Sequence, residues 1–179
     1  MPLIKTVKAG NITHLTDARF FASFEVDYIG FCFDPVSASY ISPQEAQAIK
    51  GWISGPQIVA EFANQDAENI EGILTFLEPD VAELDESYPE ETVNQLREKG
   101  ILIARRLSWQ NRHLAHKDDA YTLLKDFPAD ESADGYMVLS EVDQPGYKAV
   151  HFSGTPESAT GIKAYDDLAD LLESWMEEE

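Results

Sequence analysis

Charged residues of both signs lie at the ends of apolar segments that have the composition of strands. Lys8 closes the segment 3–8, and Glu83 and Asp85 lie at the end of the segment 80–84. Side chains two positions apart on a strand point to the same face, so Glu83 and Asp85 share a face. A lysine and two carboxylates could act as acid and base or hold a cation. They could equally form a layer of salt bridges, because buried charges survive only when they are paired.

A third carboxylate, Glu61, lies in the apolar segment 57–62. Carboxylate oxygens are the hard ligands that divalent cations prefer. The spacing of Glu61, Glu83 and Asp85 matches no metal-binding pattern, however. The histidines, which are His14, His113, His116 and His151, show no metal-binding pattern either. We therefore expect no metal and no other cofactor.

The elements that position these residues follow a regular pattern over the first hundred residues. Apolar runs rich in β-branched and aromatic residues alternate with helical periodicity, which is typical of a parallel sheet covered by helices. The pattern predicts strands at 3–8, 27–33, 57–62, 80–84 and 101–105, and helices at 15–24, 43–53, 67–77 and 90–99. Helix 43–53 has the strongest start, because Ser42 and Glu45 can form a capping box around Pro43.

The pattern weakens after Ser108. Its elements are a helix at 118–127 or a strand at 120–124, strands at 136–140 and 149–152, and an amphipathic helix at 166–176. The last two strands are separated only by residues 141–148, whereas a helical crossover between parallel strands takes a dozen or more residues. Either a βα unit has been reduced to an extended return, or residues 142–146 make a hairpin turn.

Length and composition limit the class of protein. A chain of 179 residues suits one domain, residues 1–179, with a sizeable core. Its 33 acidic and 13 basic residues give a net charge of −20, which repels nucleic acid and anionic membranes, so we expect neither as a partner. The sequence has a single cysteine, Cys32, no signal-peptide pattern and no apolar run long enough for a membrane span. We therefore expect a cytoplasmic protein.

Several segments resemble the phosphoribosylanthranilate isomerase family. They are Gly10-Asn-Ile-Thr-His-Leu-Thr-Asp-Ala18, Val26-Asp-Tyr-Ile-Gly-Phe-Cys-Phe33, Tyr40-Ile-Ser-Pro-Gln-Glu-Ala46, Val59-Ala-Glu-Phe-Ala-Asn64 and Val150-His-Phe-Ser-Gly-Thr-Pro-Glu-Ser158. The resemblance implies an α/β fold, the TIM (β/α)8 barrel, and the Amadori isomerisation of tryptophan biosynthesis. Such a barrel typically takes roughly 250 residues. We therefore expect shortened later units with seven or eight strands, and we favour the extended return over the hairpin.

The resemblance also implies that the family's reacting side chains are changed here. The family uses a cysteine at the end of its first strand, where this chain has Gly10, and an aspartate at the end of its sixth. That aspartate falls at Ser140 or near Asp126, depending on which segment is the sixth strand. The family's arginine for the anthranilate carboxylate becomes Ser39, and its Gln-Leu-His-Gly segment becomes Glu83-Leu-Asp-Glu86. Losing a positioned acid or base costs roughly 100- to 10,000-fold in rate, so the ordinary isomerase activity is not expected.

In such a barrel Lys8, Glu83 and Asp85 would point inward. We expect Arg105 or Arg106 to enter the mouth near Glu83 or Asp85 while the other faces the helices. Trp109 is expected to cover a side opened by the shortening of the barrel.

Three hypotheses remain open. The leading hypothesis is a diverged isomerase-like protein without the parent activity, which binds at most a small anionic ligand at the C-terminal mouth. Ser153, Gly154 and Thr155 would hold a phosphate there through hydroxyl and backbone N–H groups.

The second hypothesis is an active isomerase on this or a related sugar phosphate. Its substitute acid and base would be chosen from Lys8, Glu83, Asp85 and Asp126. The third is a non-catalytic protein that uses an exposed barrel edge to form a homodimer or to bind a partner.

Overall fold

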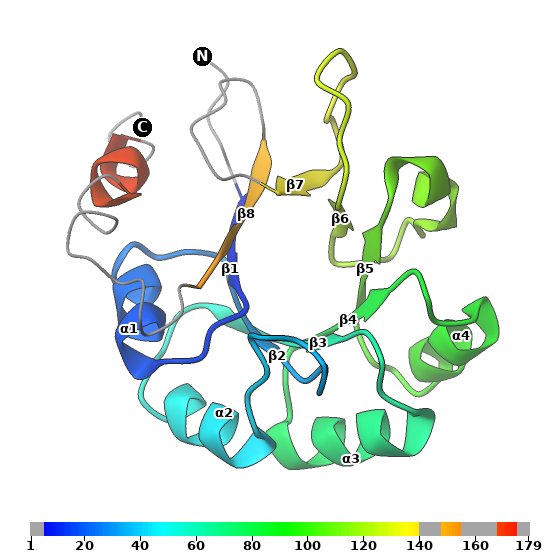
Figure 1. The fold of residues 1–179 in the computed structure, drawn as a ribbon, viewed down its shortest axis with the longest axis horizontal. Helices are drawn as coiled ribbons and strands as arrows, with labels where there is room; N and C mark the ends of the chain where they lie inside the picture. Colours follow the sequence, from blue (N-terminus) through cyan, green and yellow to red (C-terminus); the bar gives the residue numbers. More distant parts are fainter. Residues whose placement is uncertain (1–5, 140–147, 155–167, 175–179) are drawn as a thin grey trace.

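The computed structural model describes residues 6–139, 148–154 and 168–174, in which eight parallel strands close into a barrel (Figure 1). The strands are β1 (Thr6–Gly10), β2 (Tyr28–Cys32), β3 (Gln57–Phe62), β4 (Val81–Asp85), β5 (Ile103–Leu107), β6 (Thr122–Leu124), β7 (Met137–Leu139) and β8 (Ala149–Ser153). The ladder between β1 and β8 closes the barrel, and it runs from Thr6 opposite Ala149 to Gly10 opposite Ser153. The predicted fold class is confirmed, with eight strands rather than seven.

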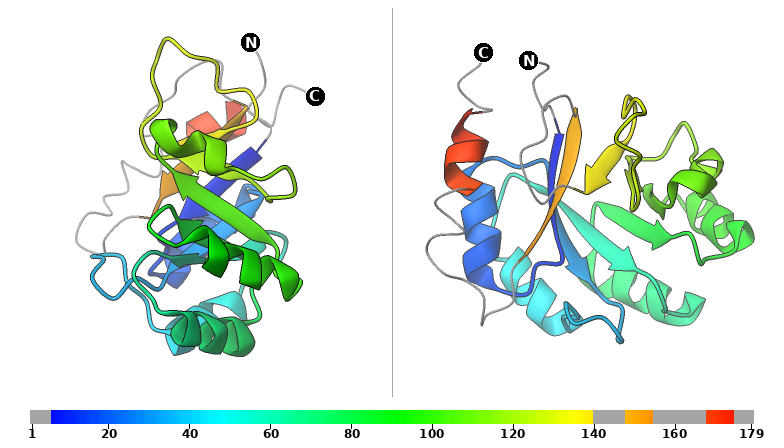
Figure 2. Two further views of the ribbon diagram at one scale, coloured as in Figure 1. Left: turned by 90° about the vertical axis from the view of Figure 1, so that its right-hand side faces the viewer. Right: turned by 45° about the horizontal axis from the view of Figure 1, so that its top comes forward.

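Four α-helices cover one side of the barrel (Figures 1 and 2). They are α1 (Leu15–Ser23), α2 (Pro43–Lys50), α3 (Ala67–Leu77) and α4 (Glu90–Glu98). The capping box at α2 is present, because Ser42 Oγ accepts a hydrogen bond from Glu45 N at 3.2 Å and Glu45 Oε2 accepts one from Ser42 N at 3.1 Å. The helices lie within a few residues of their predicted positions. No helix among the described residues is long and apolar enough to cross a membrane.

The later units are shortened as expected. Residues 108–136, which the structure describes in full, contain β6 and a 3-10 helix, η1 (Trp109–Leu114), but no α-helix. The strand alternative for residues 120–124 is therefore correct, and the helix at 118–127 is wrong. The Trp109 ring packs edge-on against Phe127 and Tyr136, with ring centroids 5.4 and 6.2 Å apart. Trp109 thus covers the side that has no α-helix.

The connection between β7 and β8 is not a hairpin. The two strands pair in parallel, with Val138 opposite Val150, whereas a hairpin would make them antiparallel. The residues between them, 140–147, lie outside the described part of the chain. Of the predicted last helix, residues 168–174 are described and helical, and Leu172 is buried in the core.

Alternation along the strands divides the barrel interior into an apolar and a charged layer. The apolar layer consists of Val59, Val81 and Ala104, with Tyr28, Ala120 and Tyr121 packed against them. Two positions further along the same strands, and therefore on the same faces, lie Glu61, Glu83 and Arg106. The interior consequently changes from apolar to charged toward the carboxyl ends of the strands.

Candidate binding site at the barrel mouth

Lys8 lies at the centre of the charged layer. Its side chain is fully buried, and its Nζ donates a hydrogen bond to Glu61 Oε2 at 2.6 Å and another to Glu83. Because β1 and β4 are not neighbours, the contact between Lys8 and Glu83 crosses the barrel interior. Asn11 N donates to Glu61 Oε1 at 2.9 Å, and Tyr121 Oη donates to Glu83 Oε2 at 2.5 Å.

These contacts keep Lys8 charged. Burial alone would lower the pKa of Lys8, but the adjacent carboxylates of Glu61 and Glu83 outweigh burial and raise that pKa. Such a lysine is a poor proton acceptor at neutral pH. Of the two interpretations of Lys8 and Glu83, an acid/base or cation site and a layer of salt bridges, the geometry is that of the layer of salt bridges.

The space beside Gly10 is filled by side chains from other strands. A Cβ atom added to Gly10 would lie 2.2 Å from His151 Cε1 and 2.7 Å from Glu61 Oε2. A Cβ atom added to Gly30 would lie 2.8 Å from Glu61 Cδ. Two glycines therefore make room for the Glu61 carboxylate inside the barrel. A cysteine at position 10 would require both His151 and Glu61 to move.

His151 is a buried residue of this layer that sequence reasoning did not select. It is 2 % exposed, its Nδ1 has no hydrogen-bond partner among the described residues, and its Nε2 lies 3.4 Å from Ser153 Oγ. Burial, together with the positive charges of Lys8 and Arg106, lowers the pKa of His151 well below its usual value. The imidazole is therefore neutral. Alternation with the apolar residues Val150 and Phe152 was the signal that could have placed it inside the barrel.

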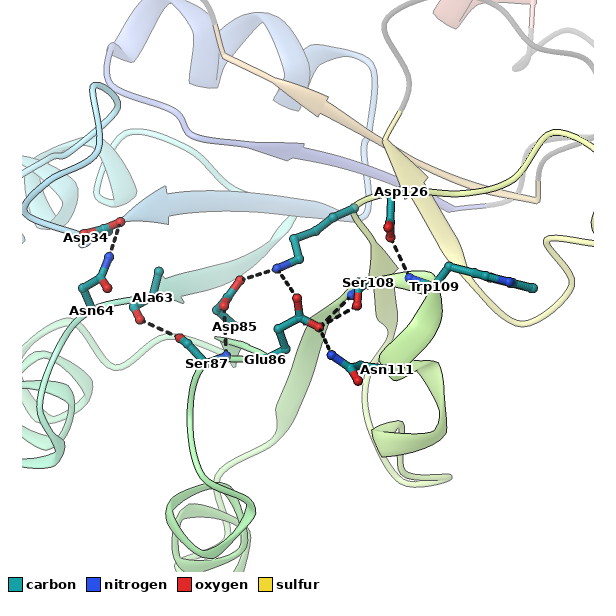
Figure 3. Close-up of polar contacts among 11 residues, drawn as sticks. Asp34, Ala63, Asn64, Asp85, Glu86, Ser87, Ser108, Trp109, Asn111 and Asp126 are labelled. Carbon is teal, nitrogen blue, oxygen red and sulfur yellow. Dashed lines mark hydrogen bonds and ion pairs between the residues drawn. The ribbon is translucent and has the colours of Figure 1, made fainter.

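At the end of β6 the residue that faces the mouth is Lys125. Its Nζ lies 2.7 Å from Glu86 Oε1 and 3.2 Å from Asp85 Oδ1. Lys125 directly precedes Asp126, near which the resemblance places the family's aspartate when this segment is the sixth strand. Asp126 instead accepts a hydrogen bond from Trp109 N at 2.6 Å and is not among the residues that line the mouth cavity (Figure 3). Sequence reasoning missed Lys125 because β6, with three residues, is too short to define its own register.

Glu86 anchors the loop after β4. Burial would raise the pKa of Glu86, but hydrogen bonds from Lys125, Ser108 and Asn111 lower it to about 2 (Figure 3). Partial burial would lower the pKa of Lys125, but its contacts with Glu86 and Asp85 outweigh burial and raise that pKa. Glu86 and Lys125 are therefore both ionised at neutral pH and form an ion pair.

A cavity of about 280 Å³ opens at the carboxyl ends of the strands. It is lined by Asn11, Cys32, Asp34, Ser37, Ser39, Glu61, Phe62, Ala63, Glu83, Asp85, Arg106 and Lys125. This end of a parallel βα barrel is where such proteins place their sites. Ser39, where the resemblance places the family's arginine, belongs to this lining.

Arg105 and Arg106 point in opposite directions, as expected. Arg105 is fully buried and pairs with Glu90 of α4, with Nη1 and Oε1 2.7 Å apart. Arg106 lines the cavity, but no ion pair joins it to Glu83 or Asp85. The predicted direction is therefore confirmed for both residues, whereas the predicted pairing is not found.

The turn after β8 forms hydrogen bonds with the end of β1 and the residue that follows it. Ser153 Oγ accepts a hydrogen bond from Asn11 Nδ2 at 3.0 Å, and Gly154 N donates to Gly10 O at 2.7 Å. A Cβ atom on Gly154 would lie 2.8 Å from Asn11 O, so the close approach of β1 explains this glycine. The Gly154 N–H is consequently occupied in this arrangement. Thr155 and Ser140 lie outside the described residues.

The fold and the mouth define a class of protein, the eight-stranded parallel βα barrels with a polar cavity at the carboxyl ends of the strands. No family model matches the chain. Curated relatives include the N-(5'-phosphoribosyl)anthranilate isomerases of Thermotoga petrophila and Thermotoga maritima, each 31% identical over 100 residues. The match covers 54% of this chain and 48% of each relative, so the chain spans about half the length of the curated relatives it matches.

Solved structures agree over nearly the whole chain. A phosphoribosylanthranilate isomerase complex superimposes with a TM-score of 0.78 and 24% identity, covering 96% of this chain and 98% of that one. The enzyme of Pyrococcus furiosus gives 0.77 at 10% identity, covering 95% and 99%. At these identities the structures show the fold alone. The predicted resemblance to phosphoribosylanthranilate isomerases is thus confirmed in sequence over 100 residues and in fold over almost the full length.

Proposed function

We propose that residues 1–179 form a single domain, a diverged phosphoribosylanthranilate isomerase that lacks the parent isomerisation and binds a small anionic ligand at its mouth. The family reaction needs a free acid and a free base beside the substrate. In this chain Gly10 stands at the first position, and at the second, which falls near Asp126 when β6 is the matching strand, Lys125 is the residue at the mouth.

The observation that carries the proposal is the occupation of both positions by paired groups. The space beside Gly10 contains the His151 ring and the Glu61 carboxylate, and that carboxylate accepts hydrogen bonds from Lys8 and Asn11. Lys125 is paired with Asp85 and Glu86. Loss of both groups supports a fall in rate of roughly 10,000-fold or more.

Ligand binding is proposed for the cavity rather than for the charged layer beneath it. The cavity lies at the carboxyl ends of the strands, where proteins of this fold place their sites. One relative was solved in complex with reduced 1-(o-carboxyphenylamino)-1-deoxyribulose 5-phosphate. The Ser153 hydroxyl at the adjacent rim supports an anion there, and Gly154 and Thr155 remain predicted partners. Titration calorimetry with inorganic phosphate and ribose 5-phosphate tests this half of the proposal, with Ser153→Ala as the variant expected to weaken binding.

Complementation tests the other half. An auxotroph that lacks the isomerase should grow without tryptophan when it carries the Thermotoga maritima enzyme and should not grow when it carries this chain. Growth, or turnover of the anthranilate ribotide by purified protein at a rate near that of the control enzyme, would overturn the proposal.

One observation favours a second candidate, an active isomerase. The Glu61 carboxylate lies beside Gly10 and lines the cavity, so it could replace the family's cysteine. Under this alternative the activity would disappear in Glu61→Gln and persist in Asp126→Asn, because Asp126 does not line the cavity. Loss in Asp126→Asn instead would assign the role to the carboxylate that the sequence suggested.

A homodimer is the remaining proposal. The phosphoribosylanthranilate isomerase of Thermotoga maritima, whose fold matches with a TM-score of 0.76 at 23% identity, is described as dimeric. Light scattering on the purified protein would decide between a mass of about 20 kDa and twice that value, the chain itself being 20.0 kDa.

A further inference from the structure

The charges that line the mouth cavity are not all paired. Six charged residues line it, namely Asp34, Glu61, Glu83, Asp85, Arg106 and Lys125. Glu61 and Glu83 share Lys8 beneath the cavity, and Asp85 is paired with Lys125. Among the residues that the structure describes, Asp34 and Arg106 have no ion-pair partner. Arg106 and Asp34 are therefore the one cation and the one anion of the cavity lining that take part in no ion pair with the described residues.

Arg106 is the unpaired cation. It is partly buried, and its Nε is buried without a hydrogen-bond partner in the described parts of the chain. A polar group taken out of water without a partner costs free energy. The planar guanidinium presents its donors as a fork that matches a carboxylate or a phosphate in two parallel hydrogen bonds. An anionic group of a ligand would supply the missing partner.

Asp34 is the unpaired anion. It follows β2 and is partly buried, and it accepts hydrogen bonds from Val36 N at 3.1 Å and from Asn64 Nδ2 at 3.0 Å (Figure 3). Both donors are neutral, so they orient the carboxylate without neutralising it. A protonated amine would neutralise it.

We infer that the mouth cavity binds a small zwitterion, with its carboxylate or phosphate on Arg106 and its protonated amine on Asp34. This inference deepens the proposed function, on which it rests. Arg106 belongs to β5 and Asp34 follows β2, and β3 and β4 separate these strands in the barrel. The two charged groups of the ligand must therefore be separated by a spacer.

Two further quantities fit such a ligand. The cavity volume of about 280 Å³ lies near the lower limit for small-molecule sites, which is roughly 300 Å³. The net charge of −20 repels a simple anion, whereas a molecule that carries an amine as well is repelled less or not at all. The same charge makes a purely anionic ligand the weaker occupant.

Titration calorimetry with matched probes tests the inference. The zwitterions are γ-aminobutyrate and phosphoethanolamine, the anions are butyrate and inorganic phosphate, and the cation is butylamine. We expect one of the zwitterions to bind at least tenfold more tightly than its matched anion and than butylamine. The carboxylate and phosphate members of the set show which anionic group Arg106 prefers.

Substitutions then assign the two ends of the ligand. Arg106→Met should weaken zwitterion binding at least tenfold, and Asp34→Asn should do so while leaving phosphate binding unchanged or stronger. Arg19→Met is the matched control, because it removes the same charge from an exposed position on α1 where Arg19 stacks on Trp52. If Arg106→Met fails to fold, Arg106→Lys, which keeps the charge and loses the fork, should still weaken binding.

Each remaining result has a defined meaning. Equal affinity for a zwitterion and its matched anion, or unchanged affinity in Arg106→Lys and Asp34→Asn, overturns the inference and leaves anion binding intact. Binding by none of the probes removes both this inference and the ligand half of the proposed function. The isomerase test is independent of all these outcomes.

Discussion

Gly10 on β1 and His151 on β8 are complementary, because the missing side chain of the glycine leaves the space that the imidazole occupies. The distance from a Cβ atom built on Gly10 to His151 Cε1 is 2.2 Å, which is shorter than any van der Waals contact. Gly10 therefore not only lacks the reactive thiol that the family's cysteine would supply. It also has a structural role, because it leaves room for the His151 ring.

Gly10→Ala should destabilise the protein. Adding a methyl group to a filled interior costs about 1–3 kcal/mol, so the free energy of unfolding should fall by that amount. Gly72→Ala on α3 is the control, because nothing lies within 4 Å of the added Cβ atom, and alanine is favoured over glycine in helices by up to about 1 kcal/mol. Urea unfolding measures both. Equal stability of Gly10→Ala and the wild type would show that His151 and Glu61 move away at no cost.

Lys8→Met should be strongly destabilising. It leaves the carboxylates of Glu61 and Glu83 buried without their cation, and breaking a buried ion pair on one side costs about 3–5 kcal/mol. The triple variant Lys8→Met, Glu61→Gln, Glu83→Gln removes all the charges and should regain most of the lost free energy of unfolding. A triple variant as unstable as Lys8→Met alone would show that packing, and not charge, was lost.

His151 should make the protein sensitive to mild acid. The pKa of His151 is lowered in the folded state, chiefly by burial, so below the unfolded value of roughly 6.5 the unfolded chain binds a proton that the folded chain excludes. The free energy of unfolding should therefore fall as pH decreases below about 6.5, by up to about 1.4 kcal/mol per pH unit from this group. His151→Gln should reduce that slope, and His113→Gln, at an exposed position, should not. Urea unfolding at pH 7.5, 6.5 and 5.5 would detect the difference.

Glu86→Gln should loosen the loops after β4 and β5. Glu86 accepts hydrogen bonds from Lys125, Ser108 and Asn111, and hydrogen bonds to a charged group contribute about 1.5–3 kcal/mol. Because hydrogen bonding lowers the pKa of Glu86 to about 2, its contribution is present above an unfolded pKa of roughly 4.3 and is lost as pH falls toward 2. The difference in stability between the wild type and Glu86→Gln should therefore shrink steadily as pH falls from about 4.3 to about 2. A constant difference down to pH 2 would contradict the assignment.

The first four βα units and the fifth strand could be predicted from the sequence because their signals are local. The capping residues Ser42 and Glu45 act within one turn of helix, and strand alternation places Glu83 and Asp85 on one face without knowledge of any other strand. The three-residue strand β6 carries too little pattern to fix which residue faces inward. Its register, and with it the position of Lys125, is determined by pairing with β5.

The details of the site depend on contacts between distant strands. Lys8 reaches Glu83 across the barrel, and His151 comes beside Gly10 only when β8 pairs with β1. Neither spacing nor composition gives the partner of a side chain when that partner lies far along the chain. The unpaired state of Asp34 and Arg106 could be recognised only after every neighbouring charge had been assigned a partner.

The ladder between β1 and β8 also governs how the chain reaches its native state. Every described residue of β1 pairs with a residue in the segment from Ala149 to Ser153. Most of the polypeptide must therefore leave the ribosome before the β8-facing edge of β1 can form its hydrogen bonds. Contacts of such long sequence separation slow folding, and an unpaired parallel edge is prone to association. A nascent chain that stalls before Ala149 should therefore depend on chaperones more than the finished protein does.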